Sequence, residues 1–166
     1  MSQSQYLRKV LDRFNMGNYK AVSTPLATHF KLSVESYPQA KMDIENMSRV
    51  PYSIAVGSLM YFIVCTRLDL SHVVSVVSCY IHNPGKDHWD AVKFFLRYVK
   101  CSINIGLVFD RNKATTSDVI GFNDSNYVSD LDKRRSILGY IVTICATAIS
   151  WIASLQSIAA LLYCGG

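Results

Sequence analysis

Three aspartates near the carboxyl end of the chain are the residues best suited to chemistry. Asp124 follows a short apolar run, and Asp130 and Asp132 come soon after it. Grouped carboxylates of this kind hold the divalent ions of phosphoryl-transfer sites, where two ions are clamped together and several acids are needed. Asp and Asn also gather in turns because their side chains bond to the local backbone. On spacing alone, both interpretations stay open.

Two groups of basic residues are candidates for contact with a polyanion. The first follows the aspartates in a polar turn, and the second lies along the flank of a predicted helix: Lys133, Arg134 and Arg135, then Lys93, Arg97 and Lys100. The net charge of +5 suits a nucleic-acid partner. A solvated flank on an ordinary surface helix explains the second group equally well, so that alternative also stays open.

Other chemistry has weak support in the sequence. Cys79, His82, His88 and Cys101 offer four zinc-binding residue types, but their spacing follows no finger or ribbon pattern and the residues between them predict apolar helices. Phosphate-loop, dinucleotide and nucleophile-elbow motifs are absent from the sequence. We therefore expect no zinc site and no enzyme of those classes.

The composition predicts a packed protein inside the cell. Half of the 166 residues are hydrophobic and 17% are charged, which is too apolar for a disordered chain. The five cysteines are scattered, as is typical of a reducing compartment. The start, MSQSQYLRKVLDRF, lacks the apolar core of a signal peptide. We expect an intracellular protein, cytoplasmic or nuclear, that is not secreted.

The elements that must position these residues change character along the chain. Helical spacing runs from Tyr6 to Phe14, and residues 21–48 predict an irregular connection. The uncharged run 50–66 is shorter than the ~20 residues that span a bilayer, so it predicts a helix buried on all sides and no membrane anchor. Two more helices are expected, one capped by Thr66 or Asp69 and one beginning at Asp87. Strands are expected at 106–109, 119–122, 140–144 and 148–151.

Four phrases, in this order, carry a resemblance to a known family. They are SQSQYLRKVLDRFNMGNYKAVSTPL, MSRVPYSIAVGSLMYFIVCTRLDLSHVVSVVS, NPGKDHWDAVKFFLRYVKCSINIGLVF and GFNDSNYVSDLDKRRSILGYIVTICATAISW. With them the chain resembles, over essentially residues 3–161, the Pol polyprotein of copia-type LTR retrotransposons. The chain is identified as a truncated fragment of such a polyprotein, from the end of the reverse transcriptase into the start of ribonuclease H.

The resemblance implies an α+β fold with two domains. Residues 1–103 would be the helical, thumb- or connection-like end of the reverse transcriptase. Residues 104–166 would be the incomplete amino-terminal part of a ribonuclease H-like domain with an antiparallel sheet. An RNA–DNA hybrid or other nucleic acid is the implied partner, and Mg²⁺ is the implied cofactor of the parent family.

The resemblance also assigns the acids. Asp124 matches the first ribonuclease H carboxylate, a metal ligand, and Asp130 matches a recurrent acid that we include as a second catalytic candidate. Asn126 stands where the family has another Asp, and the family's catalytic Glu has no counterpart in the closing residues ALLYCGG. We therefore expect weak Mg²⁺ binding, no ribonuclease H activity and residual nucleic-acid binding. The alternative is an adopted, non-enzymatic interaction or effector-like protein.

Overall fold

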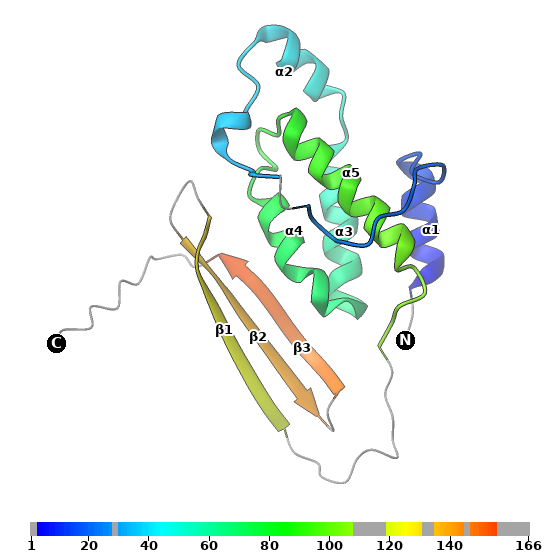
Figure 1. Ribbon diagram of the computed structural model, residues 1–166, viewed down its shortest axis with the longest axis vertical. Helices are drawn as coiled ribbons and strands as arrows, with labels where there is room; N and C mark the ends of the chain where they lie inside the picture. Colours follow the sequence, from blue (N-terminus) through cyan, green and yellow to red (C-terminus); the bar gives the residue numbers. More distant parts are fainter. Residues whose placement is uncertain (1–2, 28–29, 108–118, 131–134, 145–146, 156–166) are drawn as a thin grey trace, which may run out of the picture.

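A computed structural model shows an α+β protein in which helices precede a small antiparallel sheet (Figure 1). It describes residues 3–27, 30–107, 119–130, 135–144 and 147–155. The helical elements are α1 (Ser4–Arg13), η1 (Val34–Ser36), α2 (Lys41–Ser48), α3 (Tyr52–Thr66), η2 (Leu68–Leu70), α4 (Ser71–Ser78) and α5 (Lys86–Cys101). The strands are β1 (Val119–Asp130), β2 (Arg135–Ile144) and β3 (Thr147–Leu155).

The hydrophobic core lies among the helices. In the part of the chain that the structure describes, every buried hydrophobic residue falls between Leu7 and Val99. Helix α5 supplies one continuous face because its apolar residues recur at helical spacing. The members of that face are Ala91, Val92, Phe95, Leu96 and Val99. This face packs against α1, α3 and α4, so α5 lies at the centre of the helical part.

The sheet has the order β1-β2-β3, and both pairs of strands are antiparallel. It lies beside the helices with β3 nearest α4 (Figure 1). A hydrogen bond joins the two parts, from the Trp151 indole Nε1–H to the carbonyl oxygen of Ile63 at 3.2 Å. Large apolar side chains of the sheet remain exposed: Val119, Ile120, Phe122, Tyr140, Ile144, Ile149 and Ile152. The described side chains of the sheet are thus largely uncovered.

The expected helices and strands are confirmed in outline, with corrections. The connection predicted for residues 21–48 contains η1 and α2. The apolar residues of α2 show only weak helical spacing, because none of the residues of this helix is buried. The strands extend beyond the predicted apolar runs into polar residues. In β1, for example, pairing with β2 provides hydrogen-bond partners for the backbone of these polar residues. Gly106 and Leu107 are not in a strand, and residues 108–109 lie outside the described ones.

The expected cap of α4 is wrong. The residue before this helix is Leu70, and no side chain caps it. The Asp69 carboxylate instead accepts hydrogen bonds from Arg67, at 2.8 and 2.7 Å. The Asp69 carboxylate, which the sequence suggested for the cap, is therefore engaged in an ion pair with the buried guanidinium of Arg67.

The expectation that α3 is buried on all sides is also wrong. Ala55, Val56 and Leu59 are fully buried, but Tyr61 and Val64 are 60% and 74% exposed. No single described helix is long and apolar enough to cross a membrane, although α2 and residues 52–64, bent by 48° at their junction, meet the length and composition criteria as a pair.

Candidate functional site

The acid-bearing strand is β1, and its backbone register gives the neighbours of each candidate. Asp124 pairs with Gly139 of β2, which pairs in turn with Ala153 of β3. Asp130 pairs with Arg135 at the hairpin end, beyond an irregularity in the register after Asn126. The side chains of Asp124, Asp130 and Arg135 lie outside what the structure describes.

This register places no second carboxylate opposite Asp124 on the neighbouring strands. Oxygen ligands lie about 2.0–2.1 Å from Mg²⁺, so two carboxylates must be close neighbours to share an ion. The nearest acid on the strand, Asp130, is six residues from Asp124, which corresponds to roughly 20 Å of extended chain. The residues paired across the sheet from Asp124 are glycine and alanine. Among the described residues, no three His, Cys, Asp or Glu side chains form a group that could hold a metal.

The basic residues predicted along the flank of α5 do lie together on that helix, but all three have partners within the protein. Lys93 pairs with Asp90 at 2.6 Å, which neutralises its charge. Arg97 donates from Nε to the Lys20 carbonyl at 2.7 Å. Lys100 donates from Nζ to the Gly17 carbonyl, and to the Tyr19 carbonyl at 3.0 Å. The last two cations bind neutral carbonyls, so their positive charges are not cancelled there.

These bonds hold a loop that has further basic residues in and beside it against α5, a contact that the sequence did not indicate. The loop that Arg97 and Lys100 hold comes directly after α1, which ends at Arg13, and includes Lys20. Arg13 and Lys20 are exposed. We call these four residues, Arg13, Lys20, Arg97 and Lys100, the basic turn cluster. The other predicted basic group is not placed relative to the basic turn cluster, because Lys133 and Arg134 lie outside the described residues.

The sequence Asn-Pro-Gly-Lys-Asp-His, residues 83–88, spans the start of α5 and contacts the segment around η1. Gly85 is buried, and a Cβ atom there would lie 1.7 Å from the Ser36 carbonyl oxygen. The fully buried His88 accepts the Gly85 N–H through Nδ1 at 2.8 Å, and its Nε2 lies 3.2 Å from the Ser33 carbonyl oxygen. A carbonyl oxygen only accepts, so Nε2 carries the proton. Both ring nitrogens are therefore engaged within the fold.

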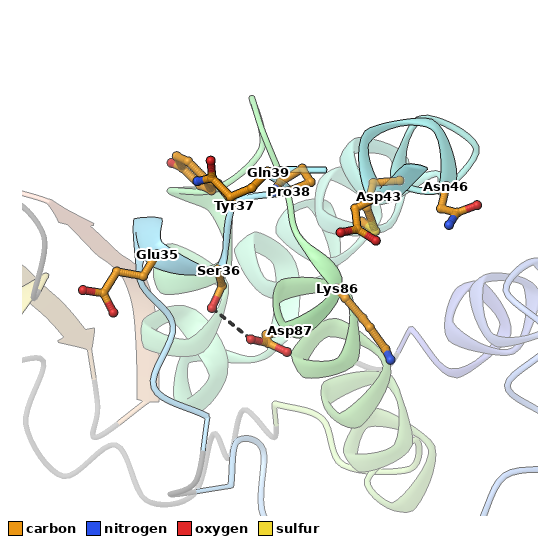
Figure 2. Close-up of a pocket in the computed structure, with 10 residues that line it drawn as sticks. Glu35, Ser36, Tyr37, Pro38, Gln39, Asp43, Asn46, Lys86 and Asp87 are labelled. Atoms are coloured by element: carbon orange, nitrogen blue, oxygen red, sulfur yellow. Dashed lines mark hydrogen bonds between the residues drawn. The ribbon is translucent and has the colours of Figure 1, made fainter. Parts of the chain in front are cut away.

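A shallow groove of about 350 Å³ lies between residues 35–39, α2 and the start of α5 (Figure 2). The Ser36 hydroxyl points toward Asp87 and donates to its Oδ2 at 2.9 Å, while Lys86 points away from that pair (Figure 2). A nucleophilic hydroxyl needs an adjacent base that is itself oriented by a third group. The neighbouring imidazole of His88 is occupied as described, so this hydrogen bond positions the loop and supplies no nucleophile.

Arg67 is a buried cation that sequence reasoning missed. Its guanidinium is 1% exposed and bonds the Asp69 carboxylate, the Ser102 hydroxyl at 2.9 Å and the Ser102 carbonyl at 3.2 Å. Burial lowers the pKa of the Arg67 guanidinium, but the hydrogen bond and charge of Asp69, with the Tyr98 hydroxyl, outweigh burial and raise it. The guanidinium ties the end of α3 to the end of α5, which is a structural role. Its acceptors at Ser102 are far along the chain, so no local pattern signals them.

Comparison with known proteins places the chain among retroelement proteins. It is 47% identical over 161 residues to the retrovirus-related Pol polyprotein from transposon TNT 1-94 of Nicotiana tabacum, covering 97% of this chain and 12% of the polyprotein. It is 36% identical over 156 residues to the Pol polyprotein from transposon RE2 of Arabidopsis thaliana, covering 94% of this chain and 10% of the polyprotein. The chain thus spans about a tenth of the length of these relatives.

A shorter relative is the secreted RxLR effector protein 161 of Plasmopara viticola. It is 38% identical over 115 residues, which cover 69% of this chain and 80% of that protein. No family model matches the chain. No solved structure matches it significantly.

The two polyproteins align with almost the whole chain, 97% and 94% of it. The chain therefore belongs to the Pol polyprotein family of copia-type retrotransposons, of which it represents a segment.

Proposed function

We propose that this Pol segment has no ribonuclease H activity and keeps a charge-driven affinity for nucleic acid. In this proposal residues 1–103 derive from the helical end of a reverse transcriptase and residues 104–166 from the first strands of a ribonuclease H-like domain. The order of helices followed by an antiparallel sheet agrees with that division.

The observation that supports inactivity is the register around Asp124. Its paired neighbours, Gly139 and Ala153, bring no second carboxylate to it. A single carboxylate neither holds two ions nor positions the attacking water, and two-metal phosphoryl transfer requires both. For the same reason we expect no tight Mg²⁺ binding.

The test is incubation of the purified protein with an RNA–DNA hybrid and Mg²⁺ or Mn²⁺. We expect no cleavage above the level seen with Asp124→Asn, which serves as the matched control. Metal-dependent cleavage by the natural sequence that disappears in Asp124→Asn would refute the proposed inactivity.

The observation that supports binding is the basic turn cluster. Its charges lie on two helices and the loop between them, and the two that make hydrogen bonds make them to neutral carbonyls. Contacts between such cations and phosphates release counterions, so binding weakens steeply with salt and is insensitive to sequence.

Fluorescence anisotropy with a labelled hybrid duplex, at several salt concentrations, tests this. We choose Arg13→Gln with Lys20→Gln because both side chains are exposed. If both contact phosphates, the slope of log affinity against log salt should fall by about 2. The double variant Lys41→Gln with Lys86→Gln removes two exposed charges elsewhere and is the control. Equal losses in both double variants would show that net charge acts without this cluster.

The match to a protein named as a secreted effector favours a second candidate, a non-enzymatic interaction protein. That relative is nearly covered by this segment, so a protein of this extent exists apart from the polyprotein. On this alternative the chain folds cooperatively yet binds no duplex at low salt. Urea unfolding and the anisotropy measurement, made on the same preparation, distinguish the two candidates.

A further inference from the structure

The loop of the basic turn cluster carries an aromatic ring that the fold does not use. Tyr19 comes directly before Lys20, and its side chain is 52% exposed. Among the described residues, its ring packs against no other ring and its hydroxyl has no hydrogen-bond partner. A single exposed aromatic residue is ordinary on a protein surface. What sets Tyr19 apart is that cations surround it and hold its backbone.

The backbone at Tyr19 is fixed by its own turn and by side chains of α5. The Tyr19 N–H donates to the Met16 carbonyl at 3.3 Å. The Tyr19 carbonyl accepts from Lys100 Nζ at 3.0 Å, and the next carbonyl, that of Lys20, accepts from Arg97 Nε at 2.7 Å. The ring is therefore presented from a loop that is already ordered. A ligand that binds a preorganised group loses less of its affinity to the ordering of that group.

Arg97 keeps donors for an acceptor outside the protein. Its guanidinium carbon lies 5.6 Å from the centroid of the Phe94 ring, over the ring face, which orients the group. Nε donates to the Lys20 carbonyl, whereas the two terminal nitrogens have no hydrogen-bond partner among the described residues. The planar fork of a guanidinium matches the oxygens of a phosphate. Phosphate-binding groups and an exposed ring thus meet in one short loop.

We propose that Tyr19 is a stacking platform for an unpaired base, so that the basic turn cluster binds single-stranded nucleic acid. In this arrangement Lys20 and Arg97 contact phosphates of the strand while the base between them lies on the Tyr19 ring. Sites for single strands combine cations with aromatic rings in this way, and the stacking is tolerant of sequence. The inference rests on the proposed affinity for nucleic acid and names the form of nucleic acid that the cluster distinguishes.

The ring distinguishes a single strand from a duplex, and the charges do not. Lysine and arginine bind the phosphates of either form. In a duplex both faces of a base are covered by the neighbouring base pairs, whereas an unpaired base can lie on an aromatic side chain. Loss of the Tyr19 ring should therefore weaken the binding of a single strand and leave the binding of a blunt-ended duplex unchanged.

Fluorescence anisotropy of the full chain with two labelled strands tests the stacking. One is a thymidine strand, and the other has the same length and the same phosphates but abasic sites in place of the bases. We expect the natural chain to bind the thymidine strand at least about fivefold more tightly. Tyr19→Ala should bind both strands as weakly as the natural chain binds the abasic one, and Tyr19→Phe should keep the preference. Tyr61→Ala removes another exposed tyrosine and should behave as the natural chain does.

The salt dependence separates the ring from the charges. Tyr19→Ala removes no charge, so the slope of log affinity against log salt should match that of the natural chain, unlike the slope of Arg13→Gln with Lys20→Gln. Equal affinity of the natural chain for the two strands, or a preference that persists in Tyr19→Ala, would overturn this inference alone. If the natural chain bound neither these strands nor the hybrid duplex at low salt, the proposed affinity for nucleic acid would be wrong as well.

Photocrosslinking locates the base without relying on affinity. With iodouracil in place of one thymine, irradiation should attach the strand to the peptide that contains Tyr19, and this crosslink should disappear in Tyr19→Ala. Mass spectrometry of the digested complex identifies the peptide. Crosslinks confined to other peptides of the natural chain would contradict the assignment of Tyr19.

Discussion

At the scale of single residues, two glycines should respond oppositely to the same substitution. Gly85→Ala forces a Cβ atom against the Ser36 backbone, where only 1.7 Å is available. We expect a loss of about 1–3 kcal/mol in the free energy of unfolding, as is typical of overpacking. Gly57→Ala places its Cβ in open space on a helix and should gain about 0.5–1 kcal/mol. Urea unfolding at low protein concentration checks both signs, and a loss in both variants would contradict the geometry.

Tyr52 should make the fold sensitive to alkali. Burial, with a smaller contribution from Cys79, raises the pKa of the Tyr52 hydroxyl above its usual value. Below about pH 10 the hydroxyl is neutral in both the folded and unfolded states. Above that pH the unfolded chain releases the proton while the folded chain keeps it. The free energy of unfolding should then fall by up to about 1.4 kcal/mol per pH unit from this group alone.

The check is the free energy of unfolding of the natural chain and of Tyr52→Phe from neutral to alkaline pH. The variant loses the hydrogen bond to the Val77 carbonyl, 2.7 Å long, and should be about 1 kcal/mol less stable at neutral pH. Its stability should then decline less steeply with pH. Tyr61→Phe, at an exposed tyrosine, is the control for a lost hydroxyl. Parallel curves for the natural chain and Tyr52→Phe would contradict the assignment.

At the scale of elements, Lys100 links α5 to the loop after α1 through two backbone carbonyls. Lys100→Met should release that loop while leaving the buried face of α5 in place. We expect faster amide hydrogen exchange across residues 14–20 and little change within α5. Lys93→Met is the control, because its partner Asp90 is on the same helix. Equal effects of the two substitutions would show that the loop does not depend on Lys100.

Local pattern predicted the elements that bury a face and missed those that do not. Helix α5 was predictable because its apolar residues keep helical spacing after an Asn-Pro-Gly stop. Helix α2 was missed because it buries nothing, and acidic Asp43 in its first turn and the exposed Glu45–Arg49 pair support it only locally. The full burial expected for α3 failed because the apolar composition of a helix does not say how many neighbours will cover it.

The candidate site could be predicted from the sequence only in part. The apolar run at 119–122 correctly predicted a strand where β1 lies, but the identity of the cross-strand neighbours Gly139 and Ala153 depends on the register, which the sequence of one strand does not encode. The partners of Arg97 and Lys100 are backbone carbonyls of a loop that is distant in the sequence. Every residue has a backbone carbonyl, so the sequence does not indicate which carbonyls these side chains bind. The assignment of these cations to nucleic-acid binding remains a prediction.

At the scale of the whole molecule, Trp151 joins the sheet to the helices. Trp151 is half-buried, and its Nε1–H reaches the Ile63 carbonyl at the end of α3. Trp151→Ala should leave the helical core intact and reduce protection of the sheet amides against hydrogen exchange by at least tenfold. Ile152→Ala, on the exposed neighbour, is the control. If helices and sheet lost protection together in Trp151→Ala, the two parts would be a single cooperative unit.

The junction of Gly85 with Ser36 has a consequence for the many copies that a mobile element leaves in a genome. Decaying copies accumulate substitutions without regard to function, and a codon for glycine changes to one for a larger residue by a single base. Because the backbone of Ser36 leaves no room for such a residue, Gly85 should separate copies whose products still fold from those whose products do not. Reading that one codon across related open frames, and expressing a few of each kind, would show whether this packing contact decides which products still fold.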